Sequence, residues 1–428
     1  MTALGFDFGT TNTVLALKDA ETTRSVAFSS SAGTQESLRT CLSFMKDRQL
    51  GNLALKVEAG AAAIATFIEN PGECRFLQSI KTFAASPLFQ STIVHARRHS
   101  FEDLMEVFMR RMMAYAGDGW PADVTRIVAG RPVQFAGNNA DENLAMQRYR
   151  EALSRFGFPD VHFVMEPVAA AFYFAENLEQ DANVLVADFG GGTTDYSIIR
   201  FERHAGRMKA IPVAHSGVGV AGDSFDFRII DNVVSPQIGK GSHFINFGKK
   251  LDIPSNYYAN FGRWNQLSIF KTLKDYQDLK GLVRQAEEPE KLELFIDLIE
   301  HDEGYPLYQA VSRLKFALSS ADEAEFDFEP LGAAGRQVVR RADFERWIQP
   351  ELGLMETALD DALARANLSE LEVDKVFLTG GTSFVPAVRS MFERRFGKER
   401  LESGGELLSI AHGLALIGES DDIESWSA

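Results

Sequence analysis

Residues 5–12 read Gly-Phe-Asp-Phe-Gly-Thr-Thr-Asn, and residues 188–195 repeat the design as Asp-Phe-Gly-Gly-Gly-Thr-Thr-Asp. In each copy an apolar run leads into the aspartate, and a glycine-containing turn leads into a second apolar run. This pattern predicts a strand, a tight turn and a second strand in both places. The copies lie about 180 residues apart, which indicates an internal repeat on the scale of a domain and therefore two related lobes.

Two such turns could together hold a phosphate group and a metal ion. A strand that ends near Asp7 or Asp188 places a carboxylate at the edge of a sheet, and the following Gly and Thr residues let backbone N–H groups point at one centre. One hairpin alone would more often be only a tight turn. Two copies facing each other predict a phosphate clamp in which the two aspartates hold hydrated Mg²⁺. The hydroxyl groups expected to add phosphate ligands are those of Thr10, Thr11, Thr193 and Thr194.

Length and charge restrict the class of protein. At ~150 residues per domain, 428 residues predict two or three domains or lobes. The 44 basic and 60 acidic residues give a net charge of −16, which argues against binding to a nucleic-acid polymer or an anionic membrane surface. A small nucleotide remains compatible, because charges farther than about 8 Å are screened. We expect a monomer whose partners are a nucleotide and an unidentified protein.

The cysteine content and the N-terminus indicate the compartment. Two cysteines, Cys41 and Cys74, exclude a disulfide scaffold and fit a reducing environment, and the eight histidines are too scattered for a zinc site. The first residues lack a basic region, and Asp7 interrupts the apolar stretch, so a signal peptide is not expected. No run of ~18 apolar residues occurs, so no transmembrane helix is expected either. The sequence therefore predicts a cytoplasmic protein.

The rest of the chain alternates helices and strands. Hydrophobic spacing and capping residues predict helices over 101–116, 141–156, 167–176, 288–300 and 343–365, the last with Asp343 as N-cap. Strands are expected over 126–129, 161–165 and 375–378. Residues 232–304 are interpreted as a separate small subdomain.

Other nucleotide-binding motifs are absent or weak. The chain contains no Gly-x4-Gly-Lys-Ser/Thr phosphate loop and no kinase catalytic motif. Gly217-Val-Gly219-Val-Ala-Gly222 matches the dinucleotide fingerprint, but a lone match is weak evidence. We interpret it as a loop beside the nucleoside that leads into a helix near Asp223.

Six segments, taken in order, resemble the nucleotide-binding domain of the DnaK-type chaperones, the heat-shock protein 70 family within the actin-like ATPase superfamily. They are residues 5–12, Met165–Ala171 (Met-Glu-Pro-Val-Ala-Ala-Ala), 188–195, Ala221–Asp226 (Ala-Gly-Asp-Ser-Phe-Asp), Lys315–Ser320 (Lys-Phe-Ala-Leu-Ser-Ser) and Leu378–Pro386 (Leu-Thr-Gly-Gly-Thr-Ser-Phe-Val-Pro). The resemblance covers most of the chain except 232–304, and the sequence looks most like the short bacterial YegD-type branch.

The resemblance implies a fold. We expect an α/β actin-like ATPase (duplicated ribonuclease H-like) fold with two lobes around a nucleotide cleft. Lobe I would span 1–180 with an outer subdomain over about 25–100, and lobe II would span 181–428 with an outer subdomain over about 227–310. The family's peptide-binding domain is not expected, because only a short polar stretch follows the last helical pattern near Ile417.

The resemblance also implies roles for individual residues. Lys81 would position the attacking water and Glu166 would polarise it, although a lysine in isolation is more often a solvated surface residue. Asp188 and Thr193 complete the expected catalytic set, and the expected metal-binding residues are Asp7, Asp188 and Asp195. Contacts to the nucleotide are expected from Gly9, Thr10, Thr11, Asn12, Gly190, Gly191, Gly192, Thr193, Thr194, Gly222, Asp223, Lys315, Ser319, Gly380, Gly381, Thr382 and Phe384. Pro132 resembles the family's interdomain switch proline; the alternative is a simple strand-end proline.

Two departures from the family pattern carry their own hypotheses. Where the family has an acidic residue and two arginines around the adenine, this sequence has Ser312, Phe316 and Phe384. The two phenylalanines are expected either to stack on the base or to pack in the core. The enlarged interval 232–304 is the candidate partner-binding surface, with core packing as the alternative for its aromatic residues Phe244, Phe247, Tyr257, Tyr258, Phe261 and Trp264.

The expected function is Mg²⁺-dependent ATP binding with slow hydrolysis, in a chaperone-like protein whose lobe closure a partner reads. One alternative is a nucleotide-gated binding module without significant turnover. Another is a filament-forming or sugar-kinase-like relative on the same fold.

Overall fold

The computed structural model describes residues 2–18, 22–46, 55–70, 73–121, 124–135, 139–175, 178, 180–204, 207–261, 270–271, 273–301, 303–402, 408–420 and 423–426. Internal contacts divide the chain into two compact units. Unit 1 comprises residues 1–218, 358–383 and 391–428, and unit 2 comprises residues 219–357 and 384–390. This division follows contacts rather than the sequence repeat, and the expected lobe boundary near residue 180 stays a prediction.

The first sheet of unit 1 is built around the N-terminal strand. Its order is β13-β12-β1-β2-β3. Strand β1 runs antiparallel to β2 and parallel to β12, and β12 runs parallel to β13. The bounds are β1 Thr2–Phe8, β2 Asn12–Lys18, β3 Thr23–Ser25, β12 Val124–Arg131 and β13 Asp160–Met165, and β6 (Ser37–Arg39) also pairs with β2.

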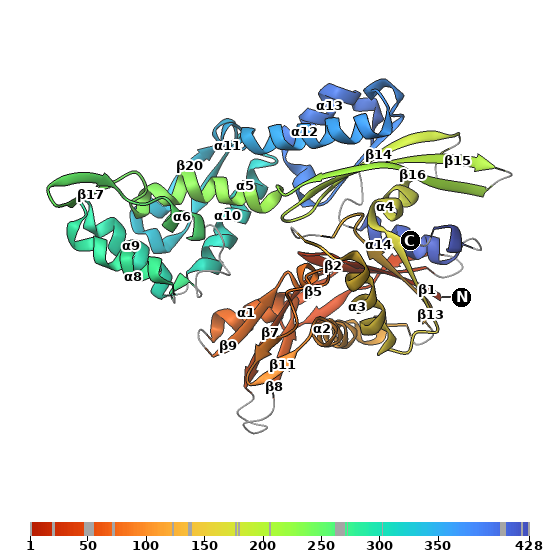
Figure 1. Ribbon diagram of the computed structural model, residues 1–428, viewed down its shortest axis with the longest axis horizontal. Coiled ribbons are helices and arrows are strands. Elements are labelled where there is room, and N and C mark those ends of the chain that lie inside the picture. The colour runs from red at the N-terminus through yellow and green to blue at the C-terminus, as the bar shows by residue number, and fades with distance from the viewer. Residues whose placement is uncertain are drawn as a thin grey trace. The chain divides into compact units, whose positions relative to one another are not determined.

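The second sheet of unit 1 repeats the first. Read in the same direction as the first sheet, its order is β22-β21-β14-β15-β16. Strand β14 runs antiparallel to β15 and parallel to β21. The bounds are β14 Ala182–Phe189, β15 Thr194–His204, β16 Arg207–Val218, β21 Lys375–Thr379 and β22 Leu401–Glu402. Both sheets have the same strand order and the same relative directions, so the predicted internal repeat is confirmed (Figure 1).

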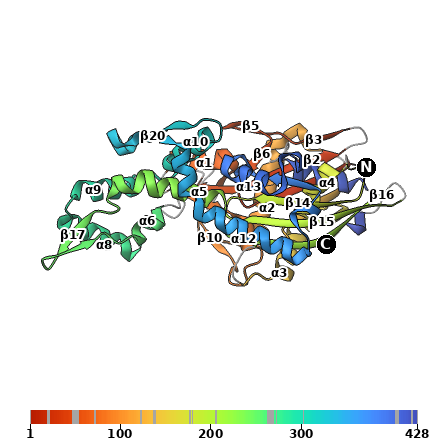
Figure 2. The same ribbon diagram turned by 90° about the horizontal axis from the view of Figure 1, so that it is seen from above.

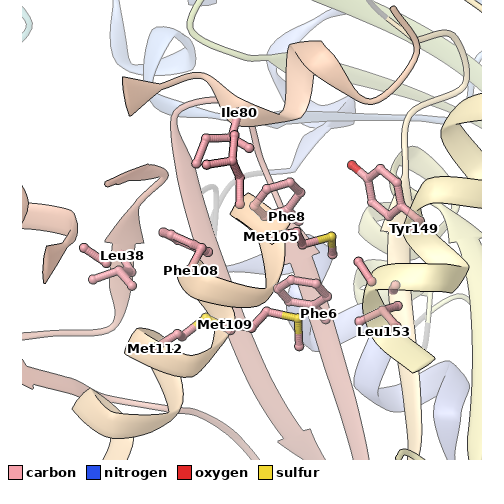
Figure 3. Packing of buried hydrophobic residues seen from close by; sticks show 14 of the residues in the cluster. Phe6, Phe8, Leu38, Ile80, Met105, Phe108, Met109, Met112, Tyr149 and Leu153 are labelled. Atoms are coloured by element: carbon pink, nitrogen blue, oxygen red, sulfur yellow. The ribbon is translucent and has the colours of Figure 1, made fainter. Parts of the chain in front are cut away.

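Two helices cover one face of the first sheet. Helix α2 (Phe101–Ala116) begins at a capping box in which Ser100 and Asp103 exchange hydrogen bonds, and α3 is Glu142–Ser154. The ring of Phe8 lies 5.8 Å from Phe108 of α2 and 6.1 Å from Tyr149 of α3. Figure 3 shows this core, in which β1 contributes aromatic rings and α2 contributes methionines. The packing fixes the end of β1, where Asp7 stands.

A second helix pair covers another part of unit 1. Helix α14 (Ser409–Gly418) packs against α4 (Glu166–Ala175) and against β1, β2 and β12 (Figure 1). The approach is close: a Cβ added to Gly413 would overlap the backbone of Ala169. Small residues therefore let α4 lie flat beside α14, which sets the position of Glu166 at the start of α4.

Smaller elements complete unit 1. Strands β8 (Leu55–Ala59), β7 (Cys41–Lys46) and β9 (Cys74–Gln78) form a three-stranded sheet against which α1 (Gly60–Glu69) packs. The short 3-10 helix η1 (Ile80–Phe83) follows β9 and carries Lys81. Two-stranded pairs are β4 (Phe28–Ser30) with β5 (Gly33–Gln35), and β10 (Thr92–Val94) with β11 (Arg97–His99).

Unit 2 is mainly helical. Its elements include α5 Gly222–Ile229, the hairpin β17 His243–Asn246 and β18 Lys249–Asp252, α6 Asn256–Phe261, α8 Lys274–Leu282, α9 Pro289–Glu300, α10 Gly304–Leu318, and the pair β19 Glu323–Asp327 and β20 Arg336–Arg340. The view in Figure 2 shows α6, α8, α9 and the hairpin gathered together. Phe295 of α9 holds this group, because its ring stacks on Tyr258 at 5.2 Å and meets Phe261 edge-on at 5.2 Å.

The aromatic residues proposed as a partner-binding patch fall into different environments. Four of them are buried in unit 2, namely Phe244, Tyr257, Tyr258 and Phe261, as core packing requires. Phe247 is fully exposed at the tip of the β17–β18 hairpin, and Trp264 lies outside the described residues. The prediction of a partner-binding surface is therefore wrong for these four residues, which pack in the core of unit 2.

One predicted helix is wrong in its extent. Residues 343–365 form parts of two helices, α11 (Arg341–Trp347) and α12 (Gln349–Ala366), and the N-cap of α11 is Arg340 rather than Asp343. Pro350 lies at the second position of α12, where a missing backbone N–H costs nothing, whereas within a continuous helix it would break a hydrogen bond. The helices predicted near 101–116, 141–156, 167–176 and 288–300 are confirmed within one or two residues.

Among the described residues, no helix is long and apolar enough to cross a membrane. Cys41 and Cys74 are both free thiols, the first buried and the second half-buried.

Candidate functional site

The two aspartates of the repeat occupy equivalent places in unit 1. Asp7 stands near the end of β1 and Asp188 near the end of β14, each in the central strand of its sheet. The neighbouring strand distinguishes them: Val14 lies opposite Asp7, whereas Asp195 lies directly opposite Asp188. The second copy therefore has two carboxylates on directly opposite residues, whereas the first has one. Like charges placed in this way repel each other.

A buried ion pair joins this region. The Nζ of Lys81, on η1, lies 2.6 Å from Oε1 of Glu166, the first residue of α4. Lys81 and Glu166 are 9% and 7% exposed. A lysine buried this deeply is not a solvated surface lysine; it is a fixed charge inside unit 1.

The carboxylates carry more negative charge than the single lysine neutralises. Burial raises the pKa of Asp7 well above its usual range, and the charges of Glu166 and Asp188 add to the rise while Lys81 opposes it. Burial and the charge of Glu166 likewise raise the pKa of Asp188. Burial and the opposing Asp188 raise the pKa of Asp195 to about 7.

The pKa of Lys81 is raised as well, and for a base this favours the charged form. Burial disfavours its ammonium form, but the neighbouring Glu166, Tyr149 and Asp7 outweigh burial, so the pKa of Lys81 is raised and the side chain stays charged. One cation thus faces a group of four acidic side chains, and a second cation would relieve the remaining repulsion.

The donor set fits a hydrated magnesium ion. Carboxylate oxygens are the ligands that Mg²⁺ prefers, and this ion usually keeps several waters and takes only one or two protein carboxylates beside phosphate oxygens. Within the described part of the chain, no three histidine, cysteine or acidic side chains are grouped closely enough to ligate a metal directly. Asp7, Asp188 and Asp195 could therefore hold such an ion through its water shell rather than as a closed protein cage.

Two glycines leave room for this arrangement. Gly217 on β16 lies opposite Asp195, and a Cβ there would come within 2.5 Å of the Asp195 Oδ1. Gly380, directly after β21, has a φ of +82°, and a Cβ there would overlap the backbone of Phe189. Because Gly217 has no side chain, the backbone of β16 can lie close to the Asp195 carboxylate. Because Gly380 has none either, the backbone after β21 can lie close to Phe189.

The hydroxyl groups predicted to bind phosphate differ in exposure. Thr193 donates to Oδ2 of Asp195 at 3.0 Å, and the backbone N–H of Gly190 closes the same turn by donating to the Thr193 carbonyl at 2.9 Å. Thr10, Thr11 and Thr193 are half-buried, whereas Thr194 is fully buried. In the remaining set, Gly9 stands in the β1–β2 turn, Asn12 is the first residue of β2, and Gly190, Gly191 and Gly192 stand in the β14–β15 turn. Gly381 and Thr382 follow β21.

The residues predicted for the nucleoside lie mostly in unit 2. Lys315 of α10 forms an ion pair with Asp226 of α5 at 2.7 Å and donates to the Gly222 carbonyl at 3.3 Å. Ser319 donates to the Lys315 carbonyl at 3.2 Å, so its hydroxyl is tied to its own helix. Asp223 is the second residue of α5. The structure thus brings Lys315 to the start of α5, beside Gly222 and Asp223.

The two phenylalanines that depart from the family pattern are exposed. Phe316 is 77% exposed and Phe384 is 48% exposed. Core packing is therefore wrong for both, and their ring faces are available to a ligand.

Two residues near the carboxylates were not predicted. Thr379 donates to Oδ1 of Asp188 at 2.8 Å, and it stands in the quoted Leu-Thr-Gly-Gly segment, where a strand-end threonine beside a glycine turn was a usable signal. The hydroxyl of Tyr149 is buried without a hydrogen-bond partner in the described residues and lies close enough to Lys81 for their charges to interact. Nothing in its helical segment distinguishes Tyr149 from a core residue.

A cavity of about 250 Å³ lies elsewhere in unit 1. It is lined by apolar residues of β13, α4, β15 and β16 together with Arg131, Glu142 and His215, and by none of the predicted site residues. Its wall includes Met165 and Pro167, the chain neighbours of Glu166, but not Glu166 itself.

Comparison with protein families identifies the chain. The model of the family described as Hsp70 protein matches residues 80–244 and 285–420, well over half of the sequence. The match includes Lys81, Glu166, Asp188 and Asp195 and leaves out the first 79 residues, so the place of Asp7 rests on the sheet repeat. Members of this family bind ATP or ADP with Mg²⁺, and many bind client proteins. The chain belongs to the Hsp70 family of nucleotide-binding, chaperone-like ATPases, and its α/β architecture is the actin-like ATPase fold.

Proposed function

We propose that this protein binds Mg²⁺-ATP at the carboxylate cluster of unit 1 and hydrolyses it slowly. The observation that carries the proposal is the group of four acids around Lys81, in which Asp7 and Glu166 are buried and Asp188 and Asp195 are half-buried. Such an excess of buried negative charge is costly without a cation. A Mg²⁺-nucleotide supplies the cation together with phosphates that glycine turns can accept.

Hydrolysis of a phosphoanhydride requires mainly positioning and charge stabilisation. When bound, Mg²⁺ would neutralise charge on the phosphates. Lys81 would hold the attacking water. Glu166, fixed 2.6 Å from Lys81, would accept a hydrogen bond from that water. Thr193, turned toward Asp195, and Thr10 are the proposed ligands of the terminal phosphate. The backbone N–H groups of Gly191 and Gly192, in the turn after Asp188, are the proposed oxyanion donors, because the Gly190 N–H already donates to the Thr193 carbonyl.

For the nucleoside we propose Gly222, Asp223, Lys315 and Ser319, with Phe384 and Phe316 stacking on the base. Their exposure supports stacking, because an exposed ring gains by covering its face with another aromatic system. If Phe384→Ala binds Mg²⁺-ATP with the affinity of the unchanged protein, the stacking hypothesis is wrong.

The test is calorimetric titration with Mg²⁺-ATP beside a phosphate-release assay. We expect binding by the unchanged protein, loss of binding when EDTA removes Mg²⁺, and slow release of phosphate. Lys81→Ala should bind ATP and lose phosphate release by about 10²-fold or more, the scale on which acid–base and electrostatic groups act. Lys56→Ala is the matched control, because the Lys56 side chain is half exposed and its Nζ lies 3.9 Å from the Glu58 carboxylate.

The outcomes separate the candidate functions. No binding of Mg²⁺-ATP refutes the proposed site. Binding without phosphate release by the unchanged protein favours a nucleotide-gated binding module. Normal release by Lys81→Ala means that another group positions the water. Nucleotide-dependent light scattering would point to a filament-forming relative.

Within the family we propose membership of the short bacterial YegD-type branch. The family model leaves 245–284 unmatched, inside the interval 232–304 that the sequence predicts to be enlarged. A protein partner is proposed for this interval, with exposed Phe247 as its one supported aromatic contact.

A further inference from the structure

A buried arginine on α3 binds the segment that follows Lys81. Two terminal nitrogens of Arg148 donate to four backbone carbonyl groups at 2.6–3.2 Å. The acceptors are the carbonyls of Phe83, Ala84, Ser86 and Phe89. The Nε of Arg148 lies 3.7 Å from the carboxylate of Glu102 on α2. Arg148 is only 7% exposed, so its hydrogen-bonding capacity is spent inside the protein.

The segment 83–89 is folded around this guanidinium. The rings of Phe83 and Phe89 stack at 4.3 Å with an interplanar angle of 6°, which closes the turn. The backbone N–H of Asp141, the N-cap of α3, donates to the Ala85 carbonyl at 2.9 Å. Helix α3 therefore holds the segment at five successive or near-successive carbonyls. A turn whose carbonyls point inward in this way depends on a donor that the turn itself lacks.

The chain is also fixed on the other side of Lys81. Ser79 has a φ of +54°, a left-handed conformation that a residue with a side chain adopts only when its surroundings impose it. Thr82 imposes it by donating to the Ser79 carbonyl from both its backbone N–H at 3.0 Å and its hydroxyl at 2.7 Å. Lys81 thus stands between a strained turn and a carbonyl cluster bound by Arg148.

We propose that Arg148 is a positioning residue that fixes the backbone of Lys81 and thereby holds its Nζ against Glu166. This inference rests on the proposed function only where it predicts a change in the rate of ATP hydrolysis. Arginine suits the role because its planar fork can serve several carbonyls at once, whereas the ammonium group of a lysine cannot span them. Arg148→Lys therefore keeps the charge and removes the geometry.

The kinetic test compares Arg148→Lys with Arg155→Ala. Arg155 caps the same helix and pairs with Asp103 and Glu106 of α2, but it makes none of the contacts to segment 83–89. We expect Arg148→Lys to lower kcat about tenfold or more while the Kd for Mg²⁺-ATP changes less than about threefold, and Arg155→Ala to change neither. In the Lys81→Ala background, Arg148→Lys should lower kcat no further, because the lysine that it positions is gone. An equal loss in both backgrounds would overturn the proposal.

A second measurement does not depend on catalysis. Hydrogen exchange of the nucleotide-free protein should show protected amides at Thr82, Ala84, Ser86 and Phe89, whose N–H groups are bonded within the turn. Arg148→Lys should speed their exchange, and Arg155→Ala should not. If the unchanged protein binds ATP without releasing phosphate, the proposed function fails and this comparison decides on Arg148. Exchange within seconds in the unchanged protein, or unaltered exchange in Arg148→Lys, would overturn the proposal even where a variant folds poorly.

Discussion

The ion pair between Lys81 and Glu166 allows a quantitative prediction about stability. Lys81→Met removes the cation from a buried group of acids and leaves the Glu166 carboxylate, whose side chain is 9% exposed, without its partner. Removing one member of a buried ion pair costs about 3–5 kcal/mol. At 1.4 kcal/mol per factor of ten, the unfolding equilibrium should shift by more than about a hundredfold.

The double variant Lys81→Met with Glu166→Gln tests the origin of that loss. Replacing both charged groups by neutral ones of similar size is often nearly neutral. Removing the Glu166 charge also relieves Asp7 and Asp188, because that charge raises the pKa of both. We therefore expect the double variant to be more stable than the single variant and to recover most of its loss.

The assay is urea unfolding of the metal-free proteins followed by circular dichroism, with free energies from linear extrapolation. Lys280→Met is the matched control: Lys280 pairs with Glu300 at 2.5 Å, but both side chains are at least 40% exposed, so water screens the pair and its loss should cost far less than the loss of the buried pair. Equal losses in the single and double variants would refute the electrostatic reasoning. So would a Lys81→Met protein no less stable than Lys280→Met.

Three further outcomes follow from local geometry. Gly217→Ala should weaken Mg²⁺-ATP binding in calorimetry, because its Cβ would come within 2.5 Å of Asp195, whereas Gly353→Ala on α12 meets no atom within 4 Å and should bind normally. Phe247→Asn should stabilise the protein by about 1 kcal/mol in urea unfolding, because Phe247 is fully exposed and has a φ of +48°, which asparagine tolerates better. Burial lowers the pKa of His412 against a weaker opposing effect of a nearby glutamate, so the folded state binds fewer protons than the unfolded state. Stability should therefore fall as the pH drops below about 6.5, and His412→Gln should fall less steeply over the same range.

Features encoded locally could be predicted from the sequence. Each copy of the repeat contains its own strands and turn, so the sequence alone suffices to place Asp7 and Asp188 at equivalent strand ends. The break between α11 and α12 was missed because the apolar spacing continues through Pro350, and spacing alone does not reveal where one helix stops.

Features that depend on contacts between distant segments could not be predicted. No local pattern singles out Lys81; only the family resemblance did, and its burial against Glu166 comes from the packing of α4. Arg148 and Tyr149 look like ordinary residues of an amphipathic helix. Their neighbours lie about 60 or more residues away in the sequence, at Phe83 and Phe89 for Arg148 and at Phe8 for Tyr149.

Val14 lies opposite Asp7, whereas Asp195 lies opposite Asp188, and this difference bears on the direction in which a phosphate chain would bind. A fold made of two equivalent halves has an approximate twofold axis, and a phosphate chain, which has a head and a tail, could enter a perfectly symmetric site either way round with equal energy. Here only the second copy has a carboxylate opposite its strand-end aspartate, and the lysine and its glutamate partner both come from the segment before residue 180. These few differences make the two copies unequal, so the proposed phosphate ligand would favour one orientation over the other.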